Sequence, residues 1–229
     1  MALVPLESNP DVMTKFIHQL GVPSKWTLVD VYGLDPDVLA IVPKPTLALI
    51  LLYPHSKKAQ DYTSELVEKI KKDGQKISPN VFHMEQTVSN ACGTIALIHA
   101  IANNLDQIKL EDGSLKEFLD KAKDLTFEER GKLLVDTASD IIDAHEQLAQ
   151  EGQTPAPQEN APVYYHFVAF IEKDGMLYEL DGRKPFPINN GPTTKDKLLE
   201  NAAKICSEYM ARDPEELGFT MIALAAANE

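Results

Sequence analysis

The sequence predicts an α/β fold in which helices flank a central sheet built from several short strands. Helical and strand-like apolar patterns alternate along the whole chain. The strand segments are bounded by turn residues, and the helices begin at capping residues. No interdomain linker divides the 229 residues, so we expect a single domain over 1–229.

Residues 10–84 supply two helices and three strands to this prediction. Asn9 can cap a helix that Pro10 opens and Gly21 ends. Its apolar residues share one stripe: Val12, Met13, Phe16, Ile17 and Leu20. Strands are predicted over 26–32, 46–53 and 81–84, with a charged helix over 59–72 before the last of them.

The second half repeats the alternation. Thr126 and Glu129 resemble a capping box that starts another helix. The segments 163–171 and 176–181 read as two strands joined by a turn, and Cys206 falls in a late helical segment as a structural residue. Between these elements, 151–162 is polar and rich in proline, which predicts a mobile, exposed loop.

Cys92 stands where a polar loop meets the start of an apolar helix. Ser89 or Asn90 can cap this helix, and the apolar run over 95–105 predicts that it is buried. The helix dipole and the free N–H groups of a first turn favour a thiolate and can hold an oxyanion. Buried cysteines are more often small core residues, so a nucleophile and a structural thiol remain alternatives at this point.

A thiol nucleophile needs a histidine and an orienting acid, and His166 has the best setting among the six histidines. It lies in an aromatic, β-branched strand pattern where a polar side chain needs a partner. His99 shares a helix with Cys92 but lies about 10 Å further along its axis. The remaining histidines read as structural, with His83 kept as a weaker alternative base: His18, His55, His83 and His145.

His166 and Asp181 are predicted to share one face of a β-hairpin. If the turn centres between Lys173 and Asp174, His166 faces Asp181 directly. If Asp174 and Gly175 form a two-residue turn, Asp181 is the diagonal neighbour of His166. Either register gives a pair that can orient an imidazole, although a buried structural ion pair is the alternative.

Gln86 lies six residues before Cys92 in the same predicted loop. Its side-chain amide can donate a hydrogen bond to an oxyanion beside the backbone N–H of Cys92. By itself this is a weak signal, because glutamines are common in loops.

Two segments resemble the ubiquitin C-terminal hydrolases, a family of thiol proteases. The string QTVSNACGTIALIHAIANN at 86–104 is similar to the family's active-site segment, and LYELDGRKPFPI at 177–188 is similar to its acid-bearing segment. The resemblance extends from PLESNP at 5–10 through VDVYG at 29–33 to DPEEL at 213–217, and it is strongest to the small single-domain members. It implies a papain-like architecture with an antiparallel-rich sheet and a knotted chain path.

The resemblance also implies roles for individual residues. Gln86 would contribute to the oxyanion hole, Cys92 would be the nucleophile, His166 the base and acid, and Asp181 its orienter. Less specific matches place four residues near ubiquitin, with Asp30 close to its C-terminal tail: Leu6, Glu7, Asp30 and Leu217.

The family's activity is cleavage at the C-terminal glycine of ubiquitin through a thioester. The loop 151–162 matches the family's crossover loop over the active site, which would restrict leaving groups to small adducts or peptides. Two alternatives remain open: a ubiquitin-binding or ubiquitin-stabilising protein with little turnover, and a hydrolase for a ubiquitin-like modifier.

Composition limits the partners and the compartment. A formal net charge of −13 disfavours nonspecific nucleic-acid binding and favours a basic partner, which suits the arginines of the ubiquitin tail. Two cysteines make no disulfide framework and suggest a reducing compartment, so we expect the cytoplasm, with the nucleus as a second location.

The sequence also carries negative expectations. It shows no signal peptide, and the apolar segment 47–53 is too short to cross a membrane. The histidines are scattered without the spacing of metal ligands, so we expect no metal and no cofactor. A monomer is the expected state.

Overall fold

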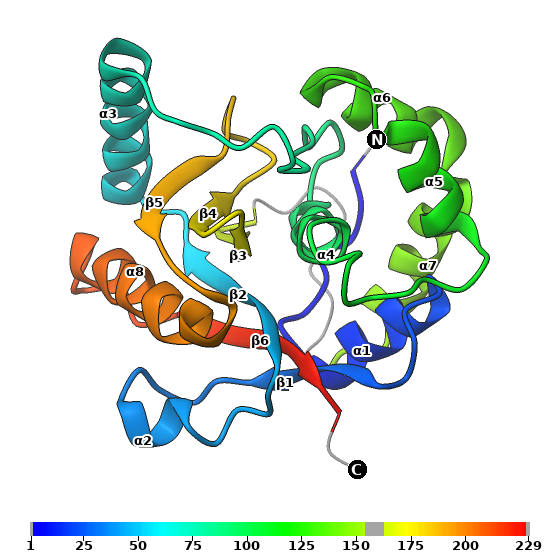
Figure 1. Cartoon of the computed structure of the whole chain (residues 1–229), viewed down its shortest axis with the longest axis horizontal. Coiled ribbons are helices and arrows are strands. Elements are labelled where there is room, and N and C mark those ends of the chain that lie inside the picture. Colours follow the sequence, from blue (N-terminus) through cyan, green and yellow to red (C-terminus); the bar gives the residue numbers. More distant parts are fainter. Residues whose placement is uncertain (1, 154–162, 228–229) are drawn as a thin grey trace.

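A six-stranded antiparallel sheet forms the centre of the computed structural model, which describes residues 2–153 and 163–227 (Figure 1). The strand order is β1-β6-β2-β3-β4-β5, so the last strand of the chain lies between the first two. The strands are β1 Trp26–Asp30, β2 Thr46–Pro54, β3 Tyr165–Lys173, β4 Met176–Leu180, β5 Ile188–Pro192 and β6 Thr220–Ala226.

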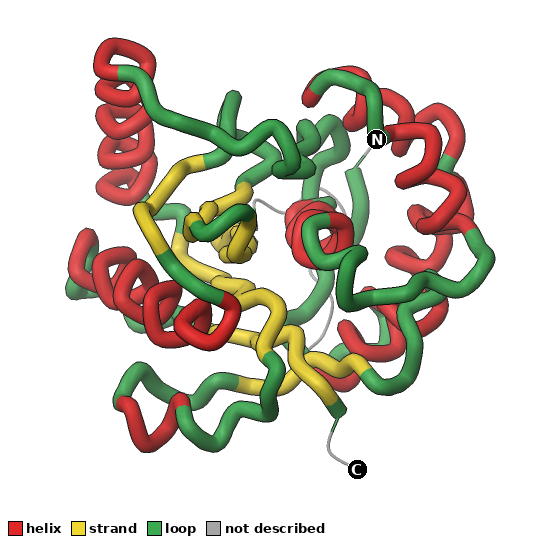
Figure 2. The backbone as a smooth tube through the Cα atoms, in the orientation of Figure 1, coloured by secondary structure: helices red, strands yellow, loops and turns green. Residues whose placement is uncertain are grey.

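Helices cover both faces of this sheet, and Figure 2 shows the two groups on either side of the strands. One face carries α1 Pro10–Gln19, α4 Cys92–Ala102, α5 Ser114–Ala122, α6 Phe127–Thr137 and α7 Ser139–Ala149. The other carries α2 Pro36–Leu39, α3 Lys57–Asp73 and α8 Leu198–Arg212, the last preceded by the short 3-10 helix η1 Lys195–Lys197. Within the described ranges, none of the helices combines the length and apolar character that crossing a bilayer requires.

The central strands are buried on both faces, because successive side chains alternate between the two helical layers. Phe167 and Ala169 of β3 pack toward α4, whereas Val168 and Phe170 pack toward α8. This alternation places His166, two residues before Val168, on the α8 face of the sheet.

Most predicted elements are confirmed within a few residues. The side chain of Asn9 accepts the N–H groups of Asp11 and Val12 at the start of α1, and Gly21 follows its end with φ 96°. The predicted strands over 26–32 and 46–53 are β1 and β2, and the helix predicted over 59–72 is α3. The Thr126–Glu129 capping box is present at the start of α6. The predicted antiparallel sheet flanked by helices is therefore correct, while the knotted path stays a prediction.

The strand predicted over 81–84 is wrong. Both main-chain groups of Phe82 bond to the side-chain amide of Asn103 at the end of α4, at 2.8 and 2.9 Å. The N–H of Met84 is 3.1 Å from Nε2 of His99. Side chains of α4 thus take the hydrogen bonds that a neighbouring strand would provide, and 81–84 remains an extended segment outside the sheet.

Candidate active site

Cys92 is the first residue of α4, as the sequence predicts, but the predicted cap is wrong. Ala91 occupies the N-cap position and no side chain caps the helix. Asn90 has φ 65°, and its side-chain amide donates instead to the carbonyl of Leu3 over 2.8 Å. Because no side chain caps the first turn, its N–H groups can bind a ligand oxygen instead.

The N-terminal segment holds the loop in front of Cys92. Ala2 pairs with Ser89 in a parallel bridge, and the N–H of Leu3 donates to the carbonyl of Ser89 over 3.0 Å. Further along, Nε2 of the buried His145 lies 2.7 Å from the carbonyl of Val4. These contacts hold the loop before Cys92 in place on the side of the sheet that carries α4.

The hairpin β3–β4 brings His166 to Asp181. Asp174 and Gly175 have φ angles of 49° and 79°, the left-handed pair that a two-residue type I′ turn requires. The second of the two predicted registers is therefore the observed one, with Asp181 diagonal to His166 on the same face. Nε2 of His166 lies 2.7 Å from Oδ1 of Asp181, and both side chains are buried.

Asp181 is held as a carboxylate by two hydrogen-bond donors and a nearby ammonium. Its Oδ1 accepts His166 and the N–H of Arg183 at 2.9 Å, and its Oδ2 is 3.5 Å from Nζ of Lys184. Burial by itself raises the pKa of Asp181, but the positive charges of His166 and Lys184 outweigh it and hold the pKa well below its usual range. An ionised acid behind His166 stabilises an imidazolium.

His166 and Cys92 favour the ion-paired state of the site. Burial lowers the pKa of His166, yet Asp181 and the Cys92 sulfur together raise the pKa to about 9. Burial raises the pKa of Cys92, but the positive charge of His166, the main chain of Phe167 and the charge of Arg183 lower the pKa overall. Nε2 of His166 contacts Asp181, and Nδ1 has no hydrogen-bond partner among the described residues. Nδ1 is therefore the ring nitrogen left for the thiol.

His83, the weaker alternative base, makes contacts that favour a structural role. Its Nε2 donates to the backbone carbonyl of Asp181 over 2.9 Å, and its ring stacks on Phe127 with centroids 4.5 Å apart. Burial lowers the pKa of His83 to about 4, so it is neutral at physiological pH. His83 therefore holds the main chain at Asp181 in place.

His55 lies closer to the site than its sequence pattern indicates. Its ring centroid is 5.7 Å from that of His166, because β2 pairs with β3 and His55 directly follows β2. Burial and then the positive charge of His166 lower the pKa of His55 to about 4. The sequence carries no local signal for this proximity, since it arises from long-range strand pairing. The other histidines make structural contacts: His18 to the carbonyl of Trp26, His99 to Met84 and His145 to Thr94.

Gln86 lies beside the site on a loop that packs against Gly182. Its N–H donates to the carbonyl of Gly182 over 2.9 Å, and its Nε2 donates to the carbonyl of Val88 over 3.1 Å. A side-chain amide carries two N–H donors, so one remains for a substrate oxyanion. A Cβ added to Gly182 would lie 2.9 Å from Cβ of Gln86 and from Cγ2 of Ile95, so the loop can approach only a glycine.

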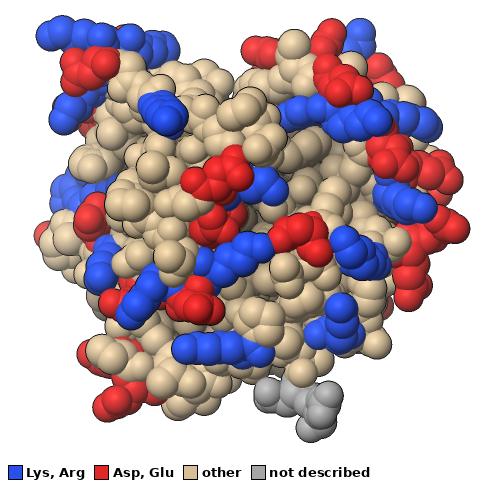
Figure 3. Space-filling view, in the orientation of Figure 1, with Lys and Arg blue, Asp and Glu red and all other residues tan. Residues whose placement is uncertain are grey.

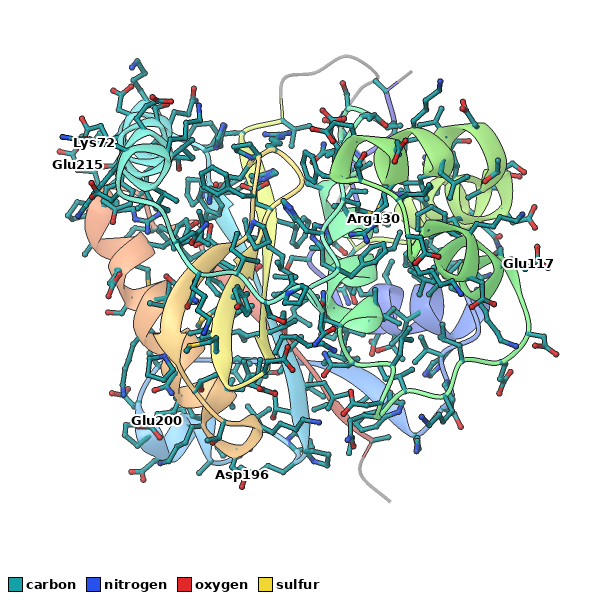
Figure 4. The ribbon with its side chains drawn as sticks, turned by 45° about the horizontal axis from the view of Figure 1, so that its top comes forward. Lys72, Glu117, Arg130, Asp196, Glu200 and Glu215 are labelled. Carbon is teal, nitrogen blue, oxygen red and sulfur yellow. The ribbon has the colours of Figure 1, made fainter. Side chains whose placement is uncertain are left out.

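Helix α6 supports this loop from behind. The guanidinium of Arg130 donates to the carbonyls of Ala122, His83 and Lys123, which ties 83–86 to the helical layer. Figure 4 shows Arg130 toward the sheet and Glu117 at the outer edge of the same layer. At Gly131 an added Cβ would lie 2.6 Å from the carbonyl oxygen of Glu85, so α6 and the Gln86 loop are in close contact.

Two of the predicted substrate-binding residues line one hollow of about 560 Å³. The charged side chains that line it in the described structure are Glu7, Asp11 and Asp30. Burial raises the pKa of Asp30 and the charge of Asp11 adds to this, against a hydrogen bond with Tyr32 that lowers it. Glu7 accepts the side-chain amide of Asn9 and the N–H of Gln153. The hollow is therefore negatively charged.

The other two predicted substrate-binding residues lie in different settings. Leu6 is buried, and a Cβ added to Gly93, the residue after Cys92, would lie 3.3 Å from its side chain. Leu217 is 88% exposed in the loop between α8 and β6. That loop ends near the hollow, because Oγ1 of Thr220 is 2.5 Å from Oγ of Ser8.

Figure 3 shows acidic side chains gathered along the edge formed by α5 to α7, with both signs mixed over the rest of that face. Cys206 is a fully buried, free thiol on α8, and burial raises its pKa far above the usual range. In the described part of the chain, His, Cys, Asp and Glu form no group of three that could hold a metal ion. Of the predicted crossover loop over 151–162, residues 154–162 lie outside the described residues.

A thiol at a helix N-terminus that faces a buried histidine–aspartate pair defines a cysteine peptidase of the papain-like class. Comparison with known proteins gives the family. Residues 3–211 match the family described as ubiquitin carboxyl-terminal hydrolase, family 1. The chain therefore belongs to that family and is a ubiquitin carboxyl-terminal hydrolase of the cysteine peptidase type.

Individual relatives match over nearly the whole chain. It is 48% identical over 225 residues to a ubiquitin carboxyl-terminal hydrolase of Drosophila melanogaster, with 98% of each chain covered. It is 43% identical over 228 residues to isozyme L1 of Homo sapiens, covering 99% of this chain and 100% of the relative. The UCH37 catalytic domain of Trichinella spiralis, solved with ubiquitin vinyl methyl ester, has a TM-score of 0.75 and 24% identity. That alignment covers 99% of this chain and 97% of the other, and it supports the fold.

Proposed function

We propose that Cys92, His166, Asp181 and Gln86 are the catalytic residues of an enzyme that releases small adducts or peptides from the C-terminal glycine of ubiquitin. The observation that carries this proposal is the 2.7 Å contact between His166 and Asp181, which leaves Nδ1 of His166 for Cys92. The family and the names of the relatives support ubiquitin as the substrate.

The lowered pKa of Cys92 supports a thiolate nucleophile. Its Sγ attacks the carbonyl carbon of the terminal glycine, and an Sγ–C bond forms. His166 donates its proton to the departing amine or thiol as the bond to that group breaks. Water then attacks the thioester while His166 accepts a proton, and the Sγ–C bond breaks to restore the thiolate.

The oxyanion of each tetrahedral intermediate needs donors beside Cys92. The backbone N–H of Cys92 lies in the first turn of α4, which has no side-chain cap. The second N–H of the Gln86 amide is the other proposed donor, while the first stays with Val88. Donors of this kind contribute about 10²- to 10³-fold each to turnover.

Charge complementarity supports binding of a basic peptide tail. Glu7 and Asp30 line the acidic hollow, where a tail carrying arginines would be attracted. Leu217 has an exposed apolar side chain on a loop that ends near the same hollow. Leu6 is buried and packs close to Gly93, the residue after Cys92. We include all four in the proposed ubiquitin-binding surface.

The loop 151–162 is proposed to limit the size of the leaving group by crossing over the site. Its described ends support this placement: Gln153 contacts Glu7 at the acidic hollow, and Val163 precedes β3 and His166 by a few residues. Insertion of glycine and serine residues after Pro157 should increase turnover of bulky conjugates. Unchanged size selectivity would count against the gate. We further propose a single catalytic domain over 1–229 that works as a monomer in the cytoplasm, with the nucleus as a second location.

Ubiquitin carrying a C-terminal fluorogenic group tests the proposal directly. We expect rapid turnover that Cys92→Ala abolishes and the matched variant Cys206→Ala retains. Tight binding with no turnover by the unmodified chain would indicate a ubiquitin-binding protein instead. Faster turnover of a ubiquitin-like modifier carrying the same group would indicate a hydrolase for that modifier.

A further inference from the structure

A buried charged cluster lies directly behind the proposed catalytic acid. Nζ of Lys184 donates to Oε1 of Glu179 and, over 3.2 Å, to the hydroxyl of Tyr209. The hydroxyl of Tyr209 donates to the same oxygen of Glu179 over 2.8 Å. All three side chains are at most 3% exposed. Nζ of Lys184 also lies 3.5 Å from Oδ2 of Asp181.

Such a cluster is costly, so its presence needs an explanation. Taking an ammonium and a carboxylate out of water costs several kcal/mol per ion, and replacing a buried pair by apolar side chains is often neutral or stabilising. A Glu179–Lys184 pair would satisfy its own charges without any other residue. Asp181 adds a second carboxylate to the same ammonium, and this arrangement links the cluster to the active site.

The two oxygens of Asp181 are held by different groups. Oδ1 accepts His166 and the N–H of Arg183, while Oδ2 faces Lys184 alone among the charged side chains of the described residues. A carboxylate held on one oxygen can rotate about its terminal bond, whereas a charge beside the second oxygen resists that rotation. Burial lowers the pKa of Lys184, but Glu179 and Asp181 outweigh it and raise the pKa, so the ammonium stays charged.

We propose that Lys184 is a positioning residue of the hydrolysis reaction: its ammonium holds the second oxygen of Asp181, so that the first stays ionised and directed at His166. Glu179 and Tyr209 in turn hold Lys184 in place. This inference deepens the proposed function and rests on it for the identity of the reaction. It gives the pair Glu179–Lys184 a role beyond the packing of α8 on the sheet.

The charged environment of the site determines what a substitution would change. Around Lys184 lie Glu179, Asp181, Tyr53 and Tyr209. Around His166 lie Asp181, Cys92, Tyr53 and His55. Arg183 acts on Cys92, and Arg212 stacks on Tyr209 at 3.6 Å from the ring centroid.

The pH dependence of Cys92 alkylation by iodoacetamide tests the inference without any ubiquitin. In Lys184→Met, the second oxygen of Asp181 is no longer held, so its first oxygen can turn away from His166. The imidazolium then loses part of its opposite charge, and the pH at which the thiolate forms should rise by about one unit, the lower end of the shift that an opposite charge within 4 to 6 Å produces. Turnover of fluorogenic ubiquitin should fall about tenfold or more, because the imidazole is no longer held in place.

Lys184→Met leaves Glu179 buried without its cation and can therefore fail to fold, so the double variant Glu179→Gln/Lys184→Met is the decisive one. It removes both charges together, and thermal unfolding should show recovered stability. The inference expects this variant to keep the shifted alkylation profile and the reduced turnover. Return of both to those of the unmodified chain would overturn it, since Lys184 would then serve only to neutralise Glu179.

Lys195→Met is the matched control, because Lys195 pairs with Asp106 at the exposed surface. We expect its alkylation profile and turnover to equal those of the unmodified chain. If the unmodified chain fails to cleave ubiquitin, the proposed function fails. The alkylation profile of the double variant still decides the role of Lys184 in that case.

Discussion

Nε2 of His166 and Oδ1 of Asp181 are 2.7 Å apart although they are fifteen residues apart in the chain. The turn at Asp174 and Gly175 sets the register of β3 and β4, and the register sets this distance. The proposed base and its acid are thus placed by main-chain pairing. Substitutions that leave the hairpin intact should therefore change their chemistry without moving them apart.

Asp181→Asn should reduce kcat by about 10³- to 10⁴-fold, as loss of a carboxylate behind a catalytic histidine does elsewhere. A neutral amide keeps the shape but does not stabilise the imidazolium. Steady-state cleavage of fluorogenic ubiquitin measures kcat, and calorimetric titration of ubiquitin into a Cys92→Ala background measures binding. Binding should be unchanged by the added Asp181→Asn substitution. A loss of kcat below tenfold would contradict the assigned role of Asp181.

The stabilising contribution of the His166 charge should fall as the pH rises from about 6.5 to about 9, while the lowered pKa of Cys92 opposes this fall in the unmodified chain. The pKa of His166 is raised from 6.5 to about 9, so its stabilising contribution is complete below 6.5 and is lost as the pH rises through 9. The lost contribution is about 3 kcal/mol, at about 1.4 kcal/mol per pH unit. Asp181 has a lowered pKa, so its contribution persists over this range and is lost only in acid.

Urea unfolding of Cys92→Ala and of Cys92→Ala/His166→Gln across this pH range measures the effect, because Cys92→Ala removes the opposing titration of the thiol. The difference in unfolding free energy between the two proteins should become smaller or change sign as the pH rises. A difference that is constant with pH would mean that His166 carries no raised pKa.

Gly182→Ala should reduce turnover while leaving the fold largely intact. The added Cβ would meet Gln86 and Ile95 at 2.9 Å, so the Gln86 loop must shift by several tenths of an ångström. Because that loop carries a proposed oxyanion donor, kcat should drop more than KM changes. Gly113→Ala is the matched control, since a Cβ there meets nothing within 4 Å. Equal kcat values for the two variants would show that the close contact is unimportant.

Asp30→Asn should raise KM for a ubiquitin substrate at low ionic strength by up to about fivefold, the equivalent of about 1 kcal/mol for an exposed charge pair. The difference from the unmodified chain should diminish in high salt, because screening weakens the attraction of the hollow for a basic tail. The control is Asp136→Asn, an exposed acid on α6. The proposal for the hollow fails if both variants respond alike, or if the Asp30 effect is independent of salt.

Sequence reasoning could predict the positions of residues that depend on local patterns. Period-2 patterning and a two-residue turn predict that His166 and Asp181 share a face, and a loop-to-helix transition predicts the place of Cys92. The cap at Ser89 or Asn90 could not be predicted correctly, because the Asn90 amide binds Leu3, a residue 87 positions earlier in the chain. The segment 81–84 was misassigned for the same kind of reason, since Asn103 supplies its hydrogen bonds.

The cluster behind Asp181 was beyond sequence reasoning. Lys184 looks like any charged residue in a turn. Glu179 lies in a strand, and the local sequence pattern does not show that both faces of this strand are buried. Both residues are buried because α8 covers them, and Tyr209 of α8 lies 25 residues after Lys184 in the chain. The proximity of His55 to His166 likewise depends on the pairing of β2 with β3.

The bridge between Ala2 and Ser89 has a practical consequence for anyone who prepares this enzyme. A purification tag joined ahead of Ala2 would emerge next to the loop that leads into Cys92, where it can disturb activity measurements. The described C-terminal end at Ala227 follows β6 on a different side of the molecule (Figure 1). A C-terminal tag is therefore the better choice for kinetic work.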